Sequence, residues 1–221
     1  MIRIPLFPLG LVLLPGMYLP LHIFEERYKR MITECLADDR PFGIVLFDGQ
    51  HVRSAGCTAR VTEVLKRYAD GRLDIVTRGE QRFVVHEWIE EKPYAEARVR
   101  LFTDDNETLP SGKNAALLTA AGNLLADLRK EGFLPRDAAP SVLSDPASLS
   151  FFIAALEGFS SVERQQILEM TSSTERLRRC VEALSKIRDR YRLTQTIEKI
   201  IGGNGKPPVS VLTKLSDKPD S

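Results

Sequence analysis

Cysteine is scarce in this chain, which has 3 cysteines among 221 residues. Cys35, Cys57 and Cys180 are widely separated and odd in number, which argues against the disulfide framework of a small secreted protein. This pattern favours a reducing compartment, and we expect a cytoplasmic protein. Cys35 and Cys180 fall on the apolar stripes of expected helices, so we interpret them as buried apolar side chains rather than reactive thiols or metal ligands.

Recognisable catalytic and metal-binding patterns are also missing. The 3 histidines are dispersed, without the spacing that builds a metal site, and no Gly-x-Ser-x-Gly segment supplies a nucleophile elbow. The Gly-Lys pairs at Gly112 and Gly205 do not complete the Gly-x-x-x-x-Gly-Lys-Ser/Thr pattern of a phosphate-binding loop. We therefore expect no catalytic residues, no cofactor and no metal, and we expect that the chain is not an enzyme.

Net charge is low, and long uninterrupted hydrophobic runs are lacking. The 31 basic and 30 acidic residues give a formal charge of +1, so bulk electrostatics favours neither nucleic acid nor an anionic membrane. The most apolar segment, residues 4–24, is interrupted by Pro5, Pro8, Pro15 and Pro20. It cannot form a regular membrane-spanning helix, and we expect no membrane association. The prolines instead predict short strands joined by stiff turns.

Residues 1–105 predict a small antiparallel sheet with one helix. Apolar residues from Tyr28 to Leu36 recur at helical spacing, and the bulky run at residues 42–47 is typical of a central strand. Between residues 56 and 103 the apolar period shortens to two, and Asp70-Gly71 indicates a two-residue hairpin turn. About six short antiparallel strands favour a pseudo-barrel, which leaves few free edges.

Residues 106–201 predict a helical bundle. One helix is expected at residues 113–130, and Asp145-Pro146 marks the start of the next. Ser160 with Glu163, and Ser172 with Glu175, predict two capping boxes. The last helix has an apolar stripe that continues to residue 201, long enough to pair with a second copy of the chain. We therefore predict an α+β fold with a β-rich domain at 1–105, a helical domain at 106–201 ending in a long helix, and a flexible tail at 202–221.

Several segments, in this order along the chain, resemble the amino-terminal substrate-binding domain of Lon proteases. They are the proline-rich segment at residues 5–28, the hairpin segments at 56–64, 70–73 and 79–83, and the helical segments at 163–170 and 175–177. The resemblance implies a PUA-like β-domain followed by helices, and a role in capturing unfolded substrates and in assembly of the protease. The ATPase and Ser-Lys protease motifs of a full-length Lon protease are not found in this sequence.

These observations lead us to expect a non-catalytic polypeptide-binding module. Its expected partners are unfolded or flexible polypeptides and, if the chain acts as an adaptor, a AAA+ protease. Binding requires exposed apolar side chains, and the entry segment has more of them than a short strand buries on one face. The candidates are Leu11, Val12, Leu13, Leu14, Met17, Tyr18 and Leu19, with Trp88 and Tyr94 as secondary candidates. The alternative is that all nine complete the core.

Two other functions remain open from the sequence. Some PUA-like proteins bind RNA, and the hairpin region is basic, with the aromatic residues Tyr68 and Phe83 among its charges. The low net charge and the nearby Glu63 and Asp74 argue against nucleic acid as a partner. The second alternative is a peptidase-associated regulatory protein with an unrelated partner. The basic residues of the hairpin region, on which the RNA alternative depends, are Arg53, Arg60, Lys66, Arg67, Arg72, Arg78 and Arg82.

Overall fold

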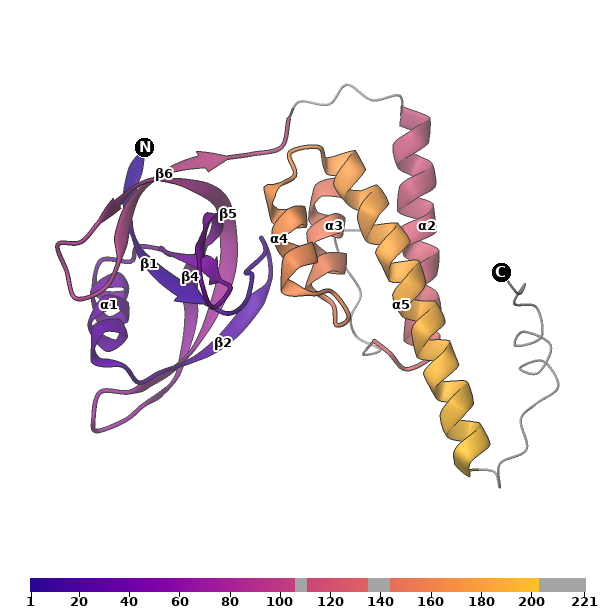
Figure 1. The fold of residues 1–221 in the computed structure, drawn as a ribbon, viewed down its shortest axis with the longest axis horizontal. Helices are drawn as coiled ribbons and strands as arrows, with labels where there is room; N and C mark the ends of the chain where they lie inside the picture. Colours follow the sequence, from indigo (N-terminus) through magenta and orange to yellow (C-terminus); the bar gives the residue numbers. More distant parts are fainter. Residues whose placement is uncertain (106–110, 135–143, 203–221) are drawn as a thin grey trace.

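The computed structural model describes residues 1–105, 111–134 and 144–202. Figure 1 shows a barrel-like sheet beside a helical half, with the two packed together. This arrangement confirms the predicted α+β class. The sheet has six strands, and helix α1 (Glu26–Ala37) lies between the second and third in the chain. The strands are β1 (Ile2–Leu9), β2 (Tyr18–Ile23), β3 (Phe42–Phe47), β4 (Val52–Arg67), β5 (Leu73–Ile89) and β6 (Glu96–Phe102).

Five of the strands close into a barrel. The ring runs β1-β3-β4-β5-β6 and returns to β1, because β6 pairs with both β5 and β1. Strand β5 is 17 residues long, so its first half also pairs with β2 while its second half pairs with β6. Closure satisfies the backbone groups that an open sheet leaves at its edges. In the described part of the chain, β2 is the only strand of this sheet that pairs with a single neighbour.

Two details of the predicted sheet are wrong. Strand β1 pairs with β3 in parallel, so the sheet is not wholly antiparallel. The turn at Asp70-Gly71 belongs to a three-residue loop, because Tyr68 N donates to Arg72 O at 3.0 Å and Gly71 N donates to Tyr68 O at 3.0 Å. Only Gly71 in this loop has a positive φ, +82°. This is a turn followed by a glycine bulge, a common alternative to the two-residue hairpin.

The barrel interior is filled by side chains from four strands. Phe83 on β5 is fully buried and packs with a cluster made of Ile4, Leu6, Val45, Ala97 and Val99. A Cβ at Gly43 would lie 2.6 Å from Leu6 and 2.7 Å from the Phe83 ring. These distances are too short for a van der Waals contact, so glycine at this position makes room for the aromatic ring.

Four helices form the second half, and the local sequence signals place most of their ends correctly. Asp145 caps α3 by accepting from Ala147 N and Ser148 N. Ser160 and Glu163 form the predicted capping box at the start of α4. Ser172 Oγ accepts from Glu175 N at 3.1 Å, while the Glu175 carboxylate binds Arg178. The helices are α2 (Ser111–Lys130), α3 (Pro146–Ala155), α4 (Ser161–Glu169) and α5 (Ser173–Gly202).

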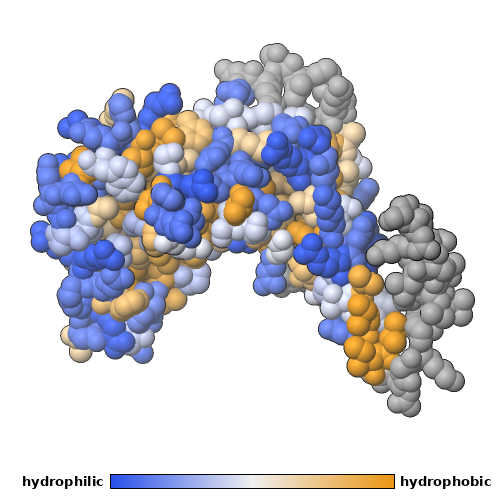
Figure 2. Space-filling view, viewed as in Figure 1, coloured by the Kyte–Doolittle hydropathy of each residue, from blue (hydrophilic) through white to orange (hydrophobic). Residues whose placement is uncertain are grey.

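The apolar stripe of α5 is buried at its start and exposed at its end. Leu177, Cys180 and Leu184 are fully buried, whereas the apolar residues near the end of the helix form the hydrophobic surface that Figure 2 shows at the lower end of α5. The exposed residues are Leu193 at 56%, Ile197 at 45% and Ile201 at 74%. The predicted tail falls outside the described residues apart from Gly202, and the predicted domain boundary adjoins residues 106–110, which are also outside them.

None of the described helices combines the length and the apolar character that a membrane crossing requires.

Candidate functional site

Five of the nine candidate binding residues are buried and belong to the core, whereas the alternative interpretation placed all nine there. Val12, Leu13, Leu14 and Leu19 are at most 8% exposed, and Tyr94 is 2% exposed. Side chains buried to this degree cannot meet a partner in this structure. Four candidates keep accessible surface. Tyr18 is 61% exposed and Trp88 is 43% exposed, and Leu11 and Met17 are half-buried.

Met17 and Tyr18 line a cleft of about 540 Å³ where the two halves of the molecule meet. One wall is the connection from β1 to β2 together with Arg78 of β5, whose guanidinium lies 5.9 Å from the centre of the Tyr18 ring. The opposite wall is α3. Its lining residues there are Ser148, Phe151, Phe152 and Ala155. The cleft is therefore mostly apolar, with one exposed cation at its edge.

The position of the barrel wall depends on Gly79 of β5. Gly79 N donates to Met17 O at 2.9 Å, and Gly16 N donates to Gly79 O at 2.8 Å. A Cβ at Gly79 would lie 2.2 Å from Leu14 O. Only glycine permits this close approach of two backbones. Leu13 and Leu14 fill the core beneath this wall, so the connection that carries Met17 and Tyr18 is anchored from both sides.

The position of the helical wall depends on a buried charge cluster at the joint between the halves. Asp104, just after β6, binds both Arg82 of β5 and Arg176 of α5, and its Oδ2 lies 2.6 Å from Arg176 Nη2. Arg82 and Arg176 are 4% and 0% exposed. Burial lowers the pKa of the Arg82 guanidinium, while Asp104 opposes this effect. Both arginines lie over the ring of Phe151, at 5.3 and 4.1 Å from its centre, so the same cluster positions a cleft residue.

Further bonds fix α4 against the barrel. Arg82 Nη1 donates to Leu168 O at 3.1 Å and to Met170 O at 2.5 Å. Gln165 Nε2 donates to Ala55 O at 3.1 Å, and Asp105 N donates to Thr171 O at 2.9 Å. Paired and hydrogen-bonded charges of this kind are costly to separate once they are buried. The cleft is therefore formed by two walls with a defined spacing.

The sequence did not identify the helical wall of the cleft or the charge cluster. Arg82 was expected on a basic surface, but it is buried at the joint. One signal was available for α3. Residues 146–155 are apolar on nearly every face, which indicates that the helix contacts more than one neighbouring element. No local pattern links Asp104 to Arg176, which is 72 residues away.

The rest of the expected basic surface is partly neutralised. Arg60 is held by Asp39 and Glu80, Arg72 by Asp70, and Arg53 by Asp48. Lys66 and Arg72 lie over the Tyr68 ring, at 4.5 and 4.7 Å from its centre. Cations paired in this way release fewer counterions when nucleic acid binds. The arrangement therefore gives the RNA alternative little support.

Two polar clusters outside the cleft also contain titratable groups. His22 Nδ1 lies 2.5 Å from Asp74 Oδ1, and Tyr68 Oη donates to Asp74 Oδ2 at 2.8 Å. Both contacts lower the pKa of Asp74, with that to His22 the larger cause. His22 and Asp74 are register partners on β2 and β5, and a cross-strand pair of this kind stabilises the sheet. The second cluster joins α1 to the connection between β5 and β6 through Glu34, Lys92 and Tyr94.

The three thiols are buried, as the sequence predicted for Cys35 and Cys180. Burial raises the pKa of Cys35 to about 11 and the pKa values of Cys57 and Cys180 to about 12, so all three stay protonated near neutral pH. Within the described residues, no group of three His, Cys, Asp or Glu side chains is arranged to hold a metal ion.

Comparisons with solved structures show the same fold. A Lon N-terminal domain protein from Xanthomonas campestris superposes with a TM-score of 0.65 at 24% identity, over 82% of this chain and 98% of that one. The N-terminal domain of a Mycobacterium avium complex Lon protease superposes with a TM-score of 0.66 at 21% identity, over 83% of this chain and 98% of that one.

Sequence comparisons agree. The chain is 28% identical over 212 residues to Lon protease 2 of Herpetosiphon aurantiacus, and 28% identical over 216 residues to the Lon protease of Anaeromyxobacter dehalogenans. These alignments cover 89% and 90% of this chain but 25% of each relative. The chain thus spans about a quarter of the length of the curated relatives it matches. A family model for the ATP-dependent protease La (LON) substrate-binding domain matches residues 3–186, and this protein belongs to that family.

Proposed function

We propose that this chain binds unfolded or flexible polypeptides in the cleft between the barrel and α3, and that it holds them without cleaving them. The observation that carries this proposal is the cleft itself, with Tyr18 and Met17 on one wall and Phe151 and Phe152 on the other. Its volume of about 540 Å³ falls within the range of about 300–1,000 Å³ that is usual for ligand pockets. A space of this size accepts apolar side chains of a client, and membership of a substrate-binding family supports the same function.

The neighbouring strand edge suggests how a client backbone is held. Tyr18 is also the first residue of β2, which pairs only with β5 in the described structure. An extended client that leaves the cleft along β2 can form main-chain hydrogen bonds with the free edge. Pro20 lacks an amide hydrogen, which limits the number of these bonds. Specificity therefore comes from the side chains in the cleft rather than from a long added strand.

The partner that receives a bound client is the more detailed part of the proposal. The curated relatives are Lon proteases, so an adaptor that passes clients to a Lon or another AAA+ protease is the partnership we favour, in the cytoplasm. Pairing of α5 with a second copy of the chain stays a prediction. Crosslinking and mass spectrometry from the native cell would identify the partner directly.

The test of the cleft is binding of fluorescein-labelled β-casein, measured by fluorescence anisotropy. Tyr18→Asp places a charge where an apolar client side chain is expected, and we expect affinity to fall about tenfold, as at an interface hot spot. Val162→Asp is the matched control, because Val162 on α4 is also 61% exposed and does not line the cleft. Both variants should keep the wild-type melting temperature, since exposed positions tolerate substitution.

Two results would contradict the proposal. Wild-type affinity in Tyr18→Asp would show that clients do not use the cleft, and loss of binding in Trp88→Asp alone would place the site on the second half of β5. Casein incubated with the wild-type chain should stay intact on a denaturing gel. Cleavage that persists through further purification would show that the chain is a peptidase.

A further inference from the structure

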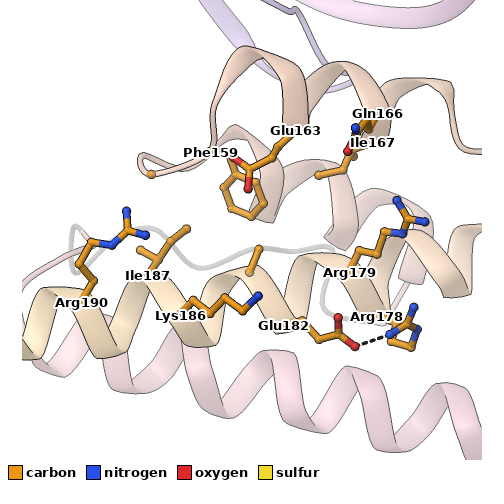
Figure 3. Close-up of a pocket in the computed structure, with 12 residues that line it drawn as sticks. Phe159, Glu163, Gln166, Ile167, Arg178, Arg179, Glu182, Lys186, Ile187 and Arg190 are labelled. Carbon is orange, nitrogen blue, oxygen red and sulfur yellow. Dashed lines mark hydrogen bonds and ion pairs between the residues drawn. The ribbon is translucent and has the colours of Figure 1, made fainter. Parts of the chain in front are cut away.

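A second groove lies between α4 and α5 and shares no lining residue with the cleft. Its volume is about 330 Å³. Figure 3 shows Glu163 on α4 directed toward α5, Ile187 directed from α5 toward α4, and the Phe159 ring between the two helices. The groove belongs to the helical half, so the argument for it is independent of the polypeptide site between the halves.

The floor of the groove is apolar. Phe159, Ile167 and Ile187 contribute to it, and each is at most 8% exposed, so only a small part of each side chain meets solvent. Gly158, just before Phe159, has a φ of +100°, and a Cβ there would lie 2.9 Å from Ile187. Glycine thus permits the connection between α3 and α4 to approach α5 closely. A floor of this kind can accept one apolar side chain of a ligand.

The walls of the groove carry an excess of positive charge. Four basic residues line it, against the two acidic residues Glu163 and Glu182. Other arginines of α5, among them Arg188, form ion pairs. Lys186 and Arg190 are exposed and form no ion pair with any residue that the structure describes. They are one helical turn apart, so their charges point to the same side of α5.

Glu163 is the acidic group opposite these two cations, but its carboxylate has another role. Its Oε2 accepts from Ser160 N at 2.8 Å and from Ser160 Oγ at 2.7 Å in the capping box of α4. These two bonds are the main causes of its lowered pKa, and the fields of Arg190 and Lys186 add to them. Glu163 therefore stays near the cations without pairing with them, and their charges remain available to a ligand.

We propose that this groove binds an acidic peptide segment, with one apolar side chain on the floor and flanking carboxylates on Lys186 and Arg190. The apolar floor distinguishes this ligand from nucleic acid, which is recognised through its phosphates and stacked bases. Glu163 and Glu182 also line the groove, and their carboxylate oxygens can accept hydrogen bonds. A peptide suits both features, since its amide groups can donate hydrogen bonds to these same carboxylates.

The experiment measures anisotropy of a fluorescein-labelled peptide, Glu-Glu-Leu-Glu-Leu-Glu-Phe-Glu-Glu, with the full chain. We expect saturable binding that the double variant Lys186→Glu/Arg190→Glu weakens by at least about tenfold, because two attractive charge pairs become repulsive. Lys130→Glu/Lys199→Glu makes the same change in net charge at two exposed lysines outside the groove, and it should weaken binding less than about threefold. The milder Lys186→Gln/Arg190→Gln serves as a second variant if the charge reversal lowers the melting temperature.

Peptide controls separate the charge from the apolar anchor. Replacing every Glu of the probe with Lys, or its Leu and Phe with Ser, should abolish saturable binding. Equal loss in the two double variants, or binding of the lysine peptide, would overturn the proposal. So would a single-stranded RNA oligonucleotide that displaces the acidic peptide and loses affinity in Lys186→Glu/Arg190→Glu, because the groove would then be a nucleic-acid site.

Discussion

Glu34 shows how single side chains join separate elements of this fold. Its Oε2 accepts from Lys92 Nζ and from Tyr94 Oη, both at 2.6 Å, and its Oε1 accepts from Arg30 Nε at 2.9 Å. These donors, Lys92 first, lower the pKa of Glu34 to about 2. Because Lys92 and Tyr94 lie between β5 and β6, the ionised carboxylate holds α1 against the barrel.

The sign of this shift predicts a pH dependence. A folded-state pKa of about 2 lies below the ordinary value, so the stabilisation from Glu34 is fully present above about pH 4.5 and is lost as the pH falls toward 2. Glu34→Gln should therefore lower the melting temperature at pH 7, and the difference from wild type should shrink at pH 3. Thermal unfolding followed by circular dichroism measures both differences.

Glu26→Gln is the matched control for this measurement. It removes a carboxylate from the same helix, but that side chain is 88% exposed, and exposed ion pairs contribute little to stability. If the difference between Glu34→Gln and wild type were the same at pH 7 and pH 3, the carboxylate would not be the stabilising group.

Residue-level properties were predictable where they depend on the type of side chain. Cys35 and Cys180 were expected to be buried from the apolar stripes that contain them, and they are. The surface of the entry segment was harder to predict, because Leu14 and Tyr18 are both apolar and tertiary contacts, such as the close approach of Leu14 to Gly79, decide which of them is buried. That contact joins residues 65 positions apart, and no local pattern encodes it.

At the scale of elements, local signals placed the helices better than the strands. Asp145-Pro146 and Ser160 with Glu163 mark helix starts because capping involves residues within a few positions of one another. Strand pairing depends on distant partners. The parallel pair of β1 with β3 therefore could not be read from the sequence. Neither could the continuity of β5 through Gly79, because a glycine inside a strand pattern is typical of a bulge or a break.

Gly79 also gives a prediction for an element, the connection between β1 and β2. Gly79→Ala would place a Cβ 2.2 Å from Leu14 O, and the connection would have to move away from β5. Overpacking of this kind should reduce the free energy of unfolding by about 2–3 kcal/mol and weaken casein binding, because Met17 and Tyr18 move with the connection. Urea unfolding and the anisotropy assay measure the two effects.

Gly122→Ala provides the comparison for this substitution. Gly122 lies inside α2, and a Cβ there would have no neighbour within 4 Å. Alanine should raise the free energy of unfolding by up to about 1 kcal/mol, because it favours the helix over the unfolded chain. Equal effects of the two substitutions would mean that the contact between Gly79 and Leu14 does not control the position of the cleft wall.

The molecule as a whole is two halves that share a core. One cluster of buried apolar residues includes Leu13 and Leu14 of the barrel half together with Phe151 and Leu177 of the helical half. The charge cluster around Asp104 lies beside this core and binds both halves. The sequence predicted a boundary between two domains after residue 105, directly beyond Asp104. The structure shows that Asp104 is part of the joint.

Asp104→Asn should therefore make the two halves unfold less cooperatively. The amide cannot neutralise Arg82 and Arg176, so two buried cations would face each other, at an expected cost of about 3 kcal/mol. We expect the wild type to unfold in one calorimetric transition and Asp104→Asn to unfold at lower temperature in a broadened or divided one.

Asp105→Asn is the control for this measurement. Asp105 accepts a side-chain hydrogen bond from Thr171 Oγ1 at 2.6 Å, and loss of this bond should cost no more than about 1.5 kcal/mol. Casein affinity should fall in Asp104→Asn and not in Asp105→Asn, because the cleft needs both walls at a fixed spacing. A single sharp transition at the same temperature in both variants would show that the apolar core alone holds the halves together.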